Sequence, residues 1–145
     1  MSFEQGFSLA NTFAIAGWIA LLLLPRWPVL ISLLKFGLIG LLSAAYAALI
    51  GVYFFRIEGG GFSSISEVRQ LFLHDGGLLA GWIHYLAFDL FVGLWIAERA
   101  DHAQLSRMLQ APILIATFMF GPLGLLMFYA TRGAQTRLPS TTAKS

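Results

Sequence analysis

The stretch WIHYLAFDLF, residues 82–91, holds a histidine and an aspartate among side chains that are otherwise almost all apolar. A carboxyl group and an imidazole are a common acid and base for proton-transfer chemistry. Placing an ionisable group near the middle of a bilayer costs at least about 2.5 kcal/mol, so such groups usually serve a function. We therefore take Asp89 and His84 as the candidate catalytic residues.

The two side chains point to different sides of the helix that this stretch predicts. They are five residues apart, which separates them by about 140° around the helix axis, so they cannot form a pair across one turn. Each side must then be covered by something other than lipid, which predicts that this helix is the centre of the fold. An alternative is that both residues only hold helices together through hydrogen bonds.

Aromatic residues around the ionisable pair form a wall suited to a long apolar ligand. Depth along antiparallel helices predicts that Thr117 and either Ser43 or Tyr46 lie level with Asp89. The candidates beside His84 are Tyr46, Tyr53, Asn11 and Thr12. The predicted ligand-binding residues are Trp82, Tyr85, Phe88, Phe91, Tyr46, Thr117 and Pro122.

A second group of possible metal ligands follows in the sequence ERADH. Glu98 and His102 are four residues apart and Asp101 lies between them, but His84 is about 21 Å below Glu98 along the same helix. The ligand set is incomplete for a closed site. We therefore predict a solvated loop without a metal, and no other cofactor.

The composition indicates a membrane protein. Of the 145 residues, 58% are hydrophobic and 11% charged, and the mean hydropathy is +0.77. The absence of cysteine excludes disulfides, thiolate metal sites and a cysteine nucleophile. A formal net charge of +2 is too small to favour nucleic-acid binding.

Four apolar segments are long enough to cross about 30 Å of hydrocarbon, and in lipid such segments must be helical. We predict one all-α transmembrane domain over residues 1–132 and a disordered tail over 133–145. With four spans both termini lie on one side, and the basic residues favour the cytoplasm for it only slightly. The predicted spans are about 8–24, 36–55, 77–97 and 109–130.

Two details of the connections carry expectations. Ser64 and Glu67 have capping-box spacing at the start of an amphipathic segment between the second and third spans, which predicts a short interfacial helix, with a solvated loop as the alternative. In the fourth span, FGPLG contains Pro122, which we expect to kink the helix. The kink would either open the backbone to a ligand or serve packing alone.

The stretches WIHYLAFDLFVGLWI, residues 82–96, and TFMFGPLGLLMFY, residues 117–129, resemble the abscisic-acid-deficient-4-like family of small polytopic membrane proteins. The resemblance covers most of the chain and is most specific around His84, Asp89 and Phe91 and at Phe120 to Pro122. It implies a helical membrane fold and a carotenoid or other isoprenoid context, because plant members are needed to make neoxanthin from violaxanthin. This chain has Leu94 where family members usually carry arginine, so Asp89 lacks that cationic neighbour.

The leading hypothesis is a multi-pass protein of a bacterial inner membrane that binds a carotenoid or other isoprenoid. If it is an enzyme, we expect isomerisation or epoxide rearrangement with Asp89 and His84 as the acid and base. The alternatives are a non-enzymatic accessory or structural subunit and a small transporter. The expected partners are the bilayer, the isoprenoid and further copies of the chain in a homo-oligomer.

Overall fold

The computed structural model describes residues 2–137, apart from the side chains of residues 136 and 137, and every regular element within this range is a helix. The all-α prediction is therefore confirmed. In chain order the elements are α1 (Phe3–Leu23), α2 (Pro28–Ser32), η1 (Leu33–Leu38), α3 (Ile39–Tyr53), η2 (Phe54–Arg56), α4 (Ile65–Leu73), α5 (Asp75–His102), α6 (Arg107–Phe120) and α7 (Pro122–Arg137).

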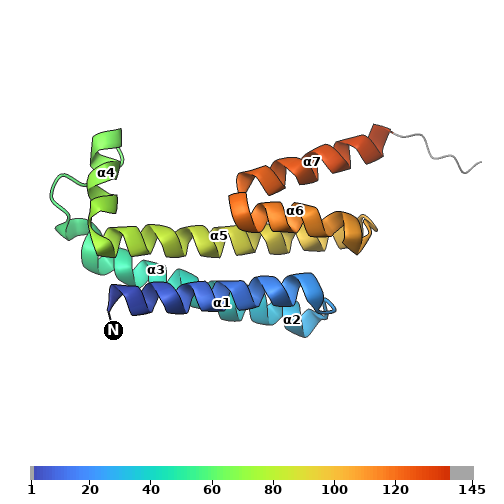
Figure 1. The fold of residues 1–145 in the computed structure, drawn as a ribbon, viewed down its shortest axis with the longest axis horizontal. Coiled ribbons are helices and arrows are strands. Elements are labelled where there is room, and N and C mark those ends of the chain that lie inside the picture. Colours follow the sequence, from blue (N-terminus) through green and yellow to red (C-terminus); the bar gives the residue numbers. More distant parts are fainter. Residues whose placement is uncertain (1, 138–145) are drawn as a thin grey trace, which may run out of the picture.

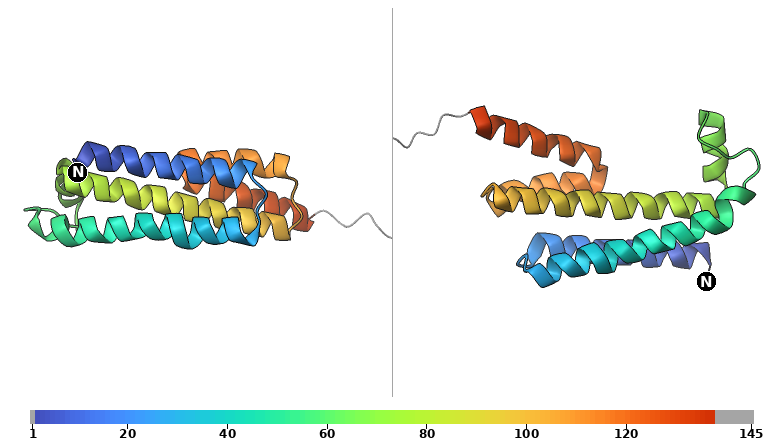
Figure 2. Two further views of the ribbon diagram at one scale, coloured as in Figure 1. Left: turned by 90° about the horizontal axis from the view of Figure 1, so that it is seen from below. Right: turned by 180° about the vertical axis from the view of Figure 1, so that it is seen from behind.

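Three long helical stretches lie side by side and alternate in direction (Figures 1 and 2). They are α1, the stretch from Pro28 to Arg56, and α5, and each is long and apolar enough to cross a membrane. In the second stretch α2, η1 and α3 follow one another directly. Pro28 is in its first turn, where the missing N–H of a proline costs no helical hydrogen bond. This helix therefore begins at Pro28 rather than near residue 36.

The prediction that the third span is central is confirmed. In its apolar stretch 56% of the residues of α5 are buried, compared with 33% for α1 and 6% for the stretch from Pro28 to Arg56. α5 packs against α1, α3, α4 and α6. At Gly93 a Cβ atom would overlap the ring of Trp18, so the glycine lets α1 approach α5 closely.

The predicted fourth span, 109–130, is wrong as a single helix. α6 ends at Phe120, Gly121 adopts a φ of 37°, and α7 starts at Pro122 and doubles back beside α6 (Figure 1). The physical reason is the Gly-Pro pair: proline disfavours helical geometry at the residue before it and is well suited to begin a helix. Glycine adopts the left-handed φ of the turn at little cost. Pro122 thus starts a second helix instead of kinking the first.

The tail also differs from the prediction. α7 continues to Arg137, so residues 133–137 of the segment predicted to be disordered are helical. Residues 138–145 of that segment lie outside the described residues.

The predicted short helix between the second and third long helices is confirmed as α4. The backbone N–H of Glu67 donates to the Ser64 hydroxyl at 3.2 Å, which caps the first turn, and the backbone N–H of Ser63 donates to the Glu67 carboxylate at 2.9 Å. The second bond uses the residue before the cap rather than the cap itself, which differs slightly from a standard capping box. α4 stands across the axis of the long helices at one end (Figure 1).

We call this end, which also holds the start of α1, the α4 end. The opposite end, with the turns at residues 24–27 and 103–106, we call the Arg26 end. There the Arg26 guanidinium donates to the Asp101 carboxylate at 2.8 Å, to the Ala97 carbonyl at 3.2 Å and to the Gln110 side chain. Burial lowers the pKa of Arg26, and its hydrogen bond and opposite charge with Asp101 act against that shift. The network joins the two turns.

Arg107 strengthens the same junction. Its guanidinium donates to the carbonyls of Leu21 and Leu24 at 3.4 and 3.0 Å. The last carbonyls of a helix have no partner within that helix, so Arg107 caps the end of α1. The start of α6 is thereby held against the end of α1.

The acidic residues of ERADH take part in ion pairs. Asp101 pairs with Arg26, and Glu98 pairs with Lys35 of η1 at 3.6 Å. In the part of the chain that the structure describes, no three histidine or acidic side chains lie close enough to hold a metal ion. Each of the two acids therefore has a cationic neighbour from another part of the chain.

Candidate functional site

The hairpin tip is the turn between α6 and α7 together with the α5 residues that it contacts, Tyr85 and Asp89. Asp89 is buried, with 9% of its surface exposed. A Cβ atom at Gly121 would overlap the Asp89 carboxylate, so the backbone of the turn lies directly against this acid. A glycine is therefore required at position 121 both for the positive φ and for the contact.

Tyr85 connects α5 to the end of α6. Its hydroxyl donates to the backbone carbonyl of Met119 at 3.1 Å, and its side chain also interacts with the Asp89 carboxylate. Met119 belongs to the last turn of α6, whose carbonyls lack partners within the helix. Tyr85 thus caps α6 from a neighbouring helix, and its spacing of four residues places it on the Asp89 side of α5.

One oxygen of Asp89 has no partner. Among the side chains that the structure describes, Oδ2 of Asp89 is the buried side-chain oxygen or nitrogen atom without a hydrogen bond. Leaving a buried polar group unpaired costs about 1–3 kcal/mol, more if it is charged, so such an atom calls for an explanation. Because Oδ2 is fully buried, a hydroxyl or ether group of a ligand would supply the missing partner once the turn at Gly121 moves to admit it.

Thr117 lies one turn before the tip but its hydroxyl is already used. It is fully buried and donates to the Ile113 carbonyl at 2.8 Å. A Cβ atom at Gly124 would overlap Thr117, so this pair sets the close approach of α6 and α7. The structure thus gives Thr117 a packing position inside the hairpin, and Pro122 an exposed one at the start of α7.

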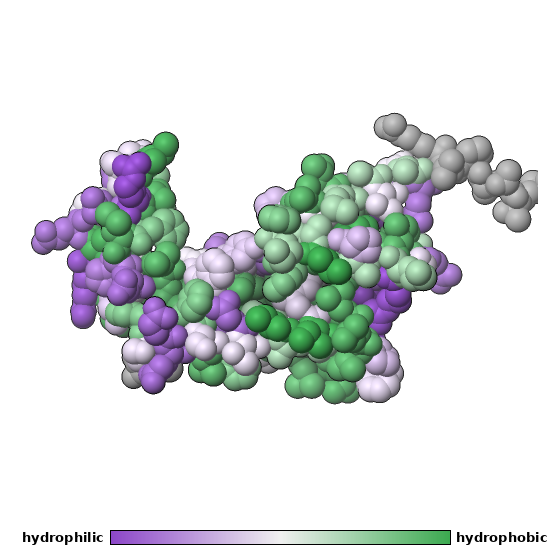
Figure 3. Space-filling view, viewed as in Figure 1, coloured by the Kyte–Doolittle hydropathy of each residue, from purple (hydrophilic) through white to green (hydrophobic). Residues whose placement is uncertain are grey.

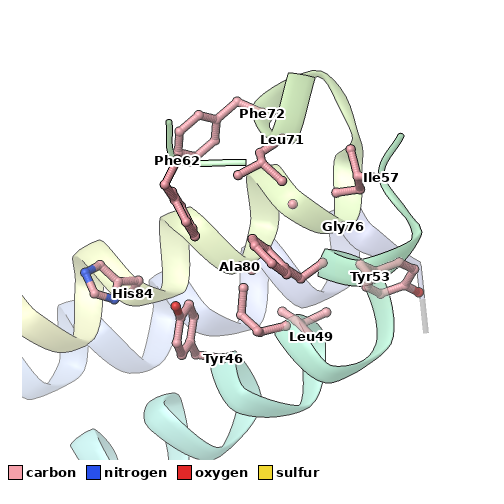
Figure 4. Close-up of a pocket in the computed structure, with 14 residues that line it drawn as sticks. Tyr46, Leu49, Tyr53, Ile57, Phe62, Leu71, Phe72, Gly76, Ala80 and His84 are labelled. Atoms are coloured by element: carbon pink, nitrogen blue, oxygen red, sulfur yellow. The ribbon is translucent and has the colours of Figure 1, made fainter. Parts of the chain in front are cut away.

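His84 has different neighbours from Asp89, as their spacing predicts. Its ring stacks on Phe88, with centroids 4.5 Å apart, and contacts Tyr46 of α3 at 5.3 Å. It lines a largely apolar cavity of about 320 Å³ between α3, α4 and α5. Figure 4 shows His84 and Tyr46 at one end of this cavity and Tyr53 at the other. Tyr46 is therefore beside His84 as predicted, whereas Tyr53 contacts His74.

The other predicted aromatic residues are divided between two further places. The Trp82 indole N–H donates to the Asn11 side chain at 3.1 Å, and its ring packs between Phe7 and Tyr85. Asn11 is therefore a partner of Trp82 rather than of His84. Phe91 is exposed and lines a shallow cavity between α5 and α7.

Sequence reasoning missed Met119, the turn at Gly121 and the Arg26 network. The Met119 carbonyl contributes through its backbone, which no side-chain pattern reveals. The pair Gly121 and Pro122 was a usable signal, because Gly-Pro is a common turn sequence. The bond between Arg26 and Asp101 joins residues 75 positions apart, and no local pattern predicts it.

The comparison with protein families gives a match to the ABA DEFICIENT 4-like family over residues 5–128. The matched range contains α1 to α6 almost entirely, the hairpin turn and the first part of α7. The chain belongs to the ABA DEFICIENT 4-like family. Searches of curated proteins and of solved structures each gave no significant match. Membership of the ABA DEFICIENT 4-like family and the three long apolar helices are consistent with a membrane protein.

Proposed function

We propose that this ABA DEFICIENT 4-like protein crosses the membrane three times, through α1, the stretch from Pro28 to Arg56, and α5. α6 and α7, with 14 and 16 residues, are about 21 and 24 Å long, too short to cross about 30 Å of hydrocarbon. They form a re-entrant hairpin that enters from the Arg26 end and turns back near mid-bilayer. On the face that Figure 3 shows, hydrophilic residues gather toward the two ends and much of the surface between them is apolar, which supports this arrangement.

In this arrangement the hairpin tip binds the oxygenated end of a long apolar isoprenoid, most simply a carotenoid. The sequence resemblance implies a carotenoid context, and the observation that supports the site is the buried, unpartnered Oδ2 of Asp89 beside Gly121. A carboxyl group accepts a hydrogen bond from a hydroxyl group and, when protonated, donates one to an epoxide oxygen, whereas a hydrocarbon offers it neither. Lipid-facing aromatic side chains of α5, such as Phe88 and Phe91, provide a surface for the polyene.

The chemistry that suits this site is isomerisation of an epoxide. One C–O bond of the epoxide breaks as its oxygen takes a proton from the Asp89 carboxyl group, and a proton leaves a nearby carbon as a new double bond forms. The product is an unsaturated alcohol with the same atoms as the epoxide, so no oxidant or reductant is consumed. The Asp89 carboxylate left behind is the base nearest to that carbon, and Tyr85 holds the tip and orients the acid.

His84 has a separate place in this proposal. Since its ring faces the cavity between α3, α4 and α5, it acts on the same ligand as Asp89 only if the ligand extends from the tip to that cavity. The length of a carotenoid permits this. A His84→Ala variant that loses bound pigment but keeps the Asp89 chemistry would assign His84 to binding.

The test is expression in a host that makes an epoxidised carotenoid, followed by purification, pigment extraction and product analysis. We expect pigment on the wild-type protein and a rearranged product in the cells. Asp89→Asn should keep the fold and the pigment but lose the product, and Asp75→Asn, which changes an exposed acid on the same helix, should behave as wild type.

Two outcomes would overturn parts of the proposal. If no pigment accompanies the wild-type protein, the isoprenoid site is wrong. If Asp89→Asn forms as much product as wild type, Asp89 is not the acid, and the non-enzymatic accessory role then explains the polar residues as contacts between helices.

A further inference from the structure

A groove runs between α5 and α7 from the Arg26 end toward the hairpin tip. We call it the α5–α7 groove, and it consists of two adjoining cavities of about 340 and 210 Å³ that share Trp95 and Tyr129. α7 starts beside the middle of α5, and the two helices diverge toward the Arg26 end (Figures 1 and 2). The outer cavity is at the open end of this divergence and the inner one is closer to the tip.

The outer cavity is cationic and aromatic. Arg99 and His102 of α5 and Arg132 of α7 line it together with Trp95, Phe128 and Tyr129. The Arg99 guanidinium lies over the Trp95 ring, 5.7 Å from its centroid, which fixes the position of the charge. No aspartate or glutamate is among the described residues that line either cavity. Two arginines facing one cavity favour a phosphate group.

The inner cavity is apolar. It is lined by Phe91 and Val92 of α5 and Leu125 of α7, besides the two shared aromatic residues. On α5 the lining residues Phe91, Trp95 and Arg99 are spaced four apart. On α7 the lining residues Leu125, Tyr129 and Arg132 are spaced four and then three apart. One face of each helix therefore presents the same order, with apolar residues near the tip and arginine near the Arg26 end.

We propose that the α5–α7 groove binds one anionic phospholipid of the bilayer, with its phosphate at Arg99 and Arg132 and an acyl chain along Trp95, Phe91 and Leu125. The positive charge of the outer cavity favours a phosphate group, and the apolar inner cavity beside it favours a lipid over a free anion. The proposal uses the membrane arrangement proposed above, in which the arginines lie at headgroup level, and is independent of the carotenoid and of any chemistry at Asp89.

The test is native mass spectrometry of the full chain in detergent micelles, titrated with long-chain phosphatidylglycerol or with phosphatidylcholine. We expect one phosphatidylglycerol molecule to be bound about thirtyfold more tightly, as two cationic side chains near the headgroup would give. Arg99→Gln/Arg132→Gln should lose this preference. Arg56→Gln/Arg69→Gln is the matched control, because it removes the same charge at the α4 end and should bind as wild type.

A second variant tests the contact with the acyl chain of the lipid. Leu125→Trp fills the inner cavity without changing charge and should weaken binding of long-chain phosphatidylglycerol at least tenfold. If the double arginine variant is not monodisperse, the two single variants and Leu125→Trp carry the test. Equal binding of both lipids by wild type, or equal losses in the double variant and its control, would overturn the proposal.

Competition with millimolar inorganic phosphate separates the two sources of the anion. Displacement of the lipid by phosphate, combined with unchanged binding by Leu125→Trp, would assign the site to a soluble anion and overturn the lipid proposal. None of these measurements uses pigment or activity. A negative result here therefore leaves the Asp89 proposal standing, and a negative pigment assay leaves this one standing.

Discussion

At the scale of single residues, the contact between Asp89 and Gly121 connects the fold to the candidate site. The acid is held against a backbone turn, and the turn exists because position 121 has no side chain. Asp89 is therefore a neighbour of peptide groups as well as of Tyr85. A pattern of side chains shows the acid, but only the path of the backbone shows what it faces.

We predict that Gly121→Ala destabilises the protein by about 1–3 kcal/mol, because the methyl group meets the Asp89 carboxylate and the left-handed φ disfavours alanine. The melting temperature of the purified protein in detergent measures this. Gly40→Ala is the control, since a Cβ atom at Gly40 meets nothing within 4 Å and alanine favours a helix. Equal melting temperatures for the two variants would contradict the close contact at Gly121.

At the scale of elements, ion pairs of different burial hold the helices at the Arg26 end. The side chain of Arg26 is 5% exposed and bonds to groups of α1, α5 and α6, whereas Lys35 and Glu98 are 38% and 35% exposed and 3.6 Å apart. Exposed pairs contribute little because water screens them. The two pairs should therefore differ clearly in their effect on stability.

We predict that Arg26→Met lowers the free energy of unfolding by about 1–3 kcal/mol, because several buried acceptors lose their donor. Lys35→Met should lower it by less than about 1 kcal/mol. Denaturation followed by circular dichroism, under identical detergent conditions, gives both values. A loss for Lys35→Met as large as that for Arg26→Met would show that the network does not hold the turns together.

A re-entrant hairpin and a fourth span place the end of α7 on opposite sides of the membrane. Because the chain has no cysteine, a single introduced cysteine is a unique label. With a re-entrant hairpin, Ala134→Cys reacts from the same side of the membrane as Gln104→Cys, whereas four spans place residue 134 with Ser63→Cys. Labelling of intact cells by a membrane-impermeant thiol reagent distinguishes the two arrangements, and lysed cells give the total signal.

Much of the element order followed from the sequence, and the hairpin did not. Periodicity predicted the central third helix and placed His84 and Asp89 on different sides, and the spacing of Ser64 and Glu67 predicted α4. Residues 109–130 are long and apolar enough for a span, so length alone suggested one helix there. Their reversal depends on the local geometry of Gly121 and on caps from Tyr85, which composition does not encode.

At the scale of the whole molecule, the hairpin changes the balance of charge between the two ends. Arg56 and Arg69 are near the α4 end, which also carries four acidic residues, Glu4, Glu58, Glu67 and Asp75. Among the described side chains, the basic residues near the Arg26 end are Arg26, Lys35, Arg99, Arg107 and Arg132, and this end carries two acidic residues, Glu98 and Asp101. With four spans Arg132 would belong to the other side, and the difference would be small.

We therefore predict that the Arg26 end faces the cytoplasm and that the start of α1 is on the opposite side, since basic residues remain inside. This differs from the sequence-based expectation of both termini in the cytoplasm. In intact cells an impermeant thiol reagent should label Ser63→Cys and not Gln104→Cys. Labelling of Gln104→Cys alone would contradict this prediction and show the opposite orientation.

The turn at Gly121 also has a consequence for water. The first amides of α7 have no acceptors within their helix, and the proposed re-entrant arrangement places them near mid-bilayer, where each still needs an acceptor. The deepest point of the hairpin should therefore be its most hydrated. In hydrogen exchange, the amides of Leu123 and Gly124 should exchange faster than those of Leu90 and Leu94 on α5, although the proposed arrangement places all four far from either surface.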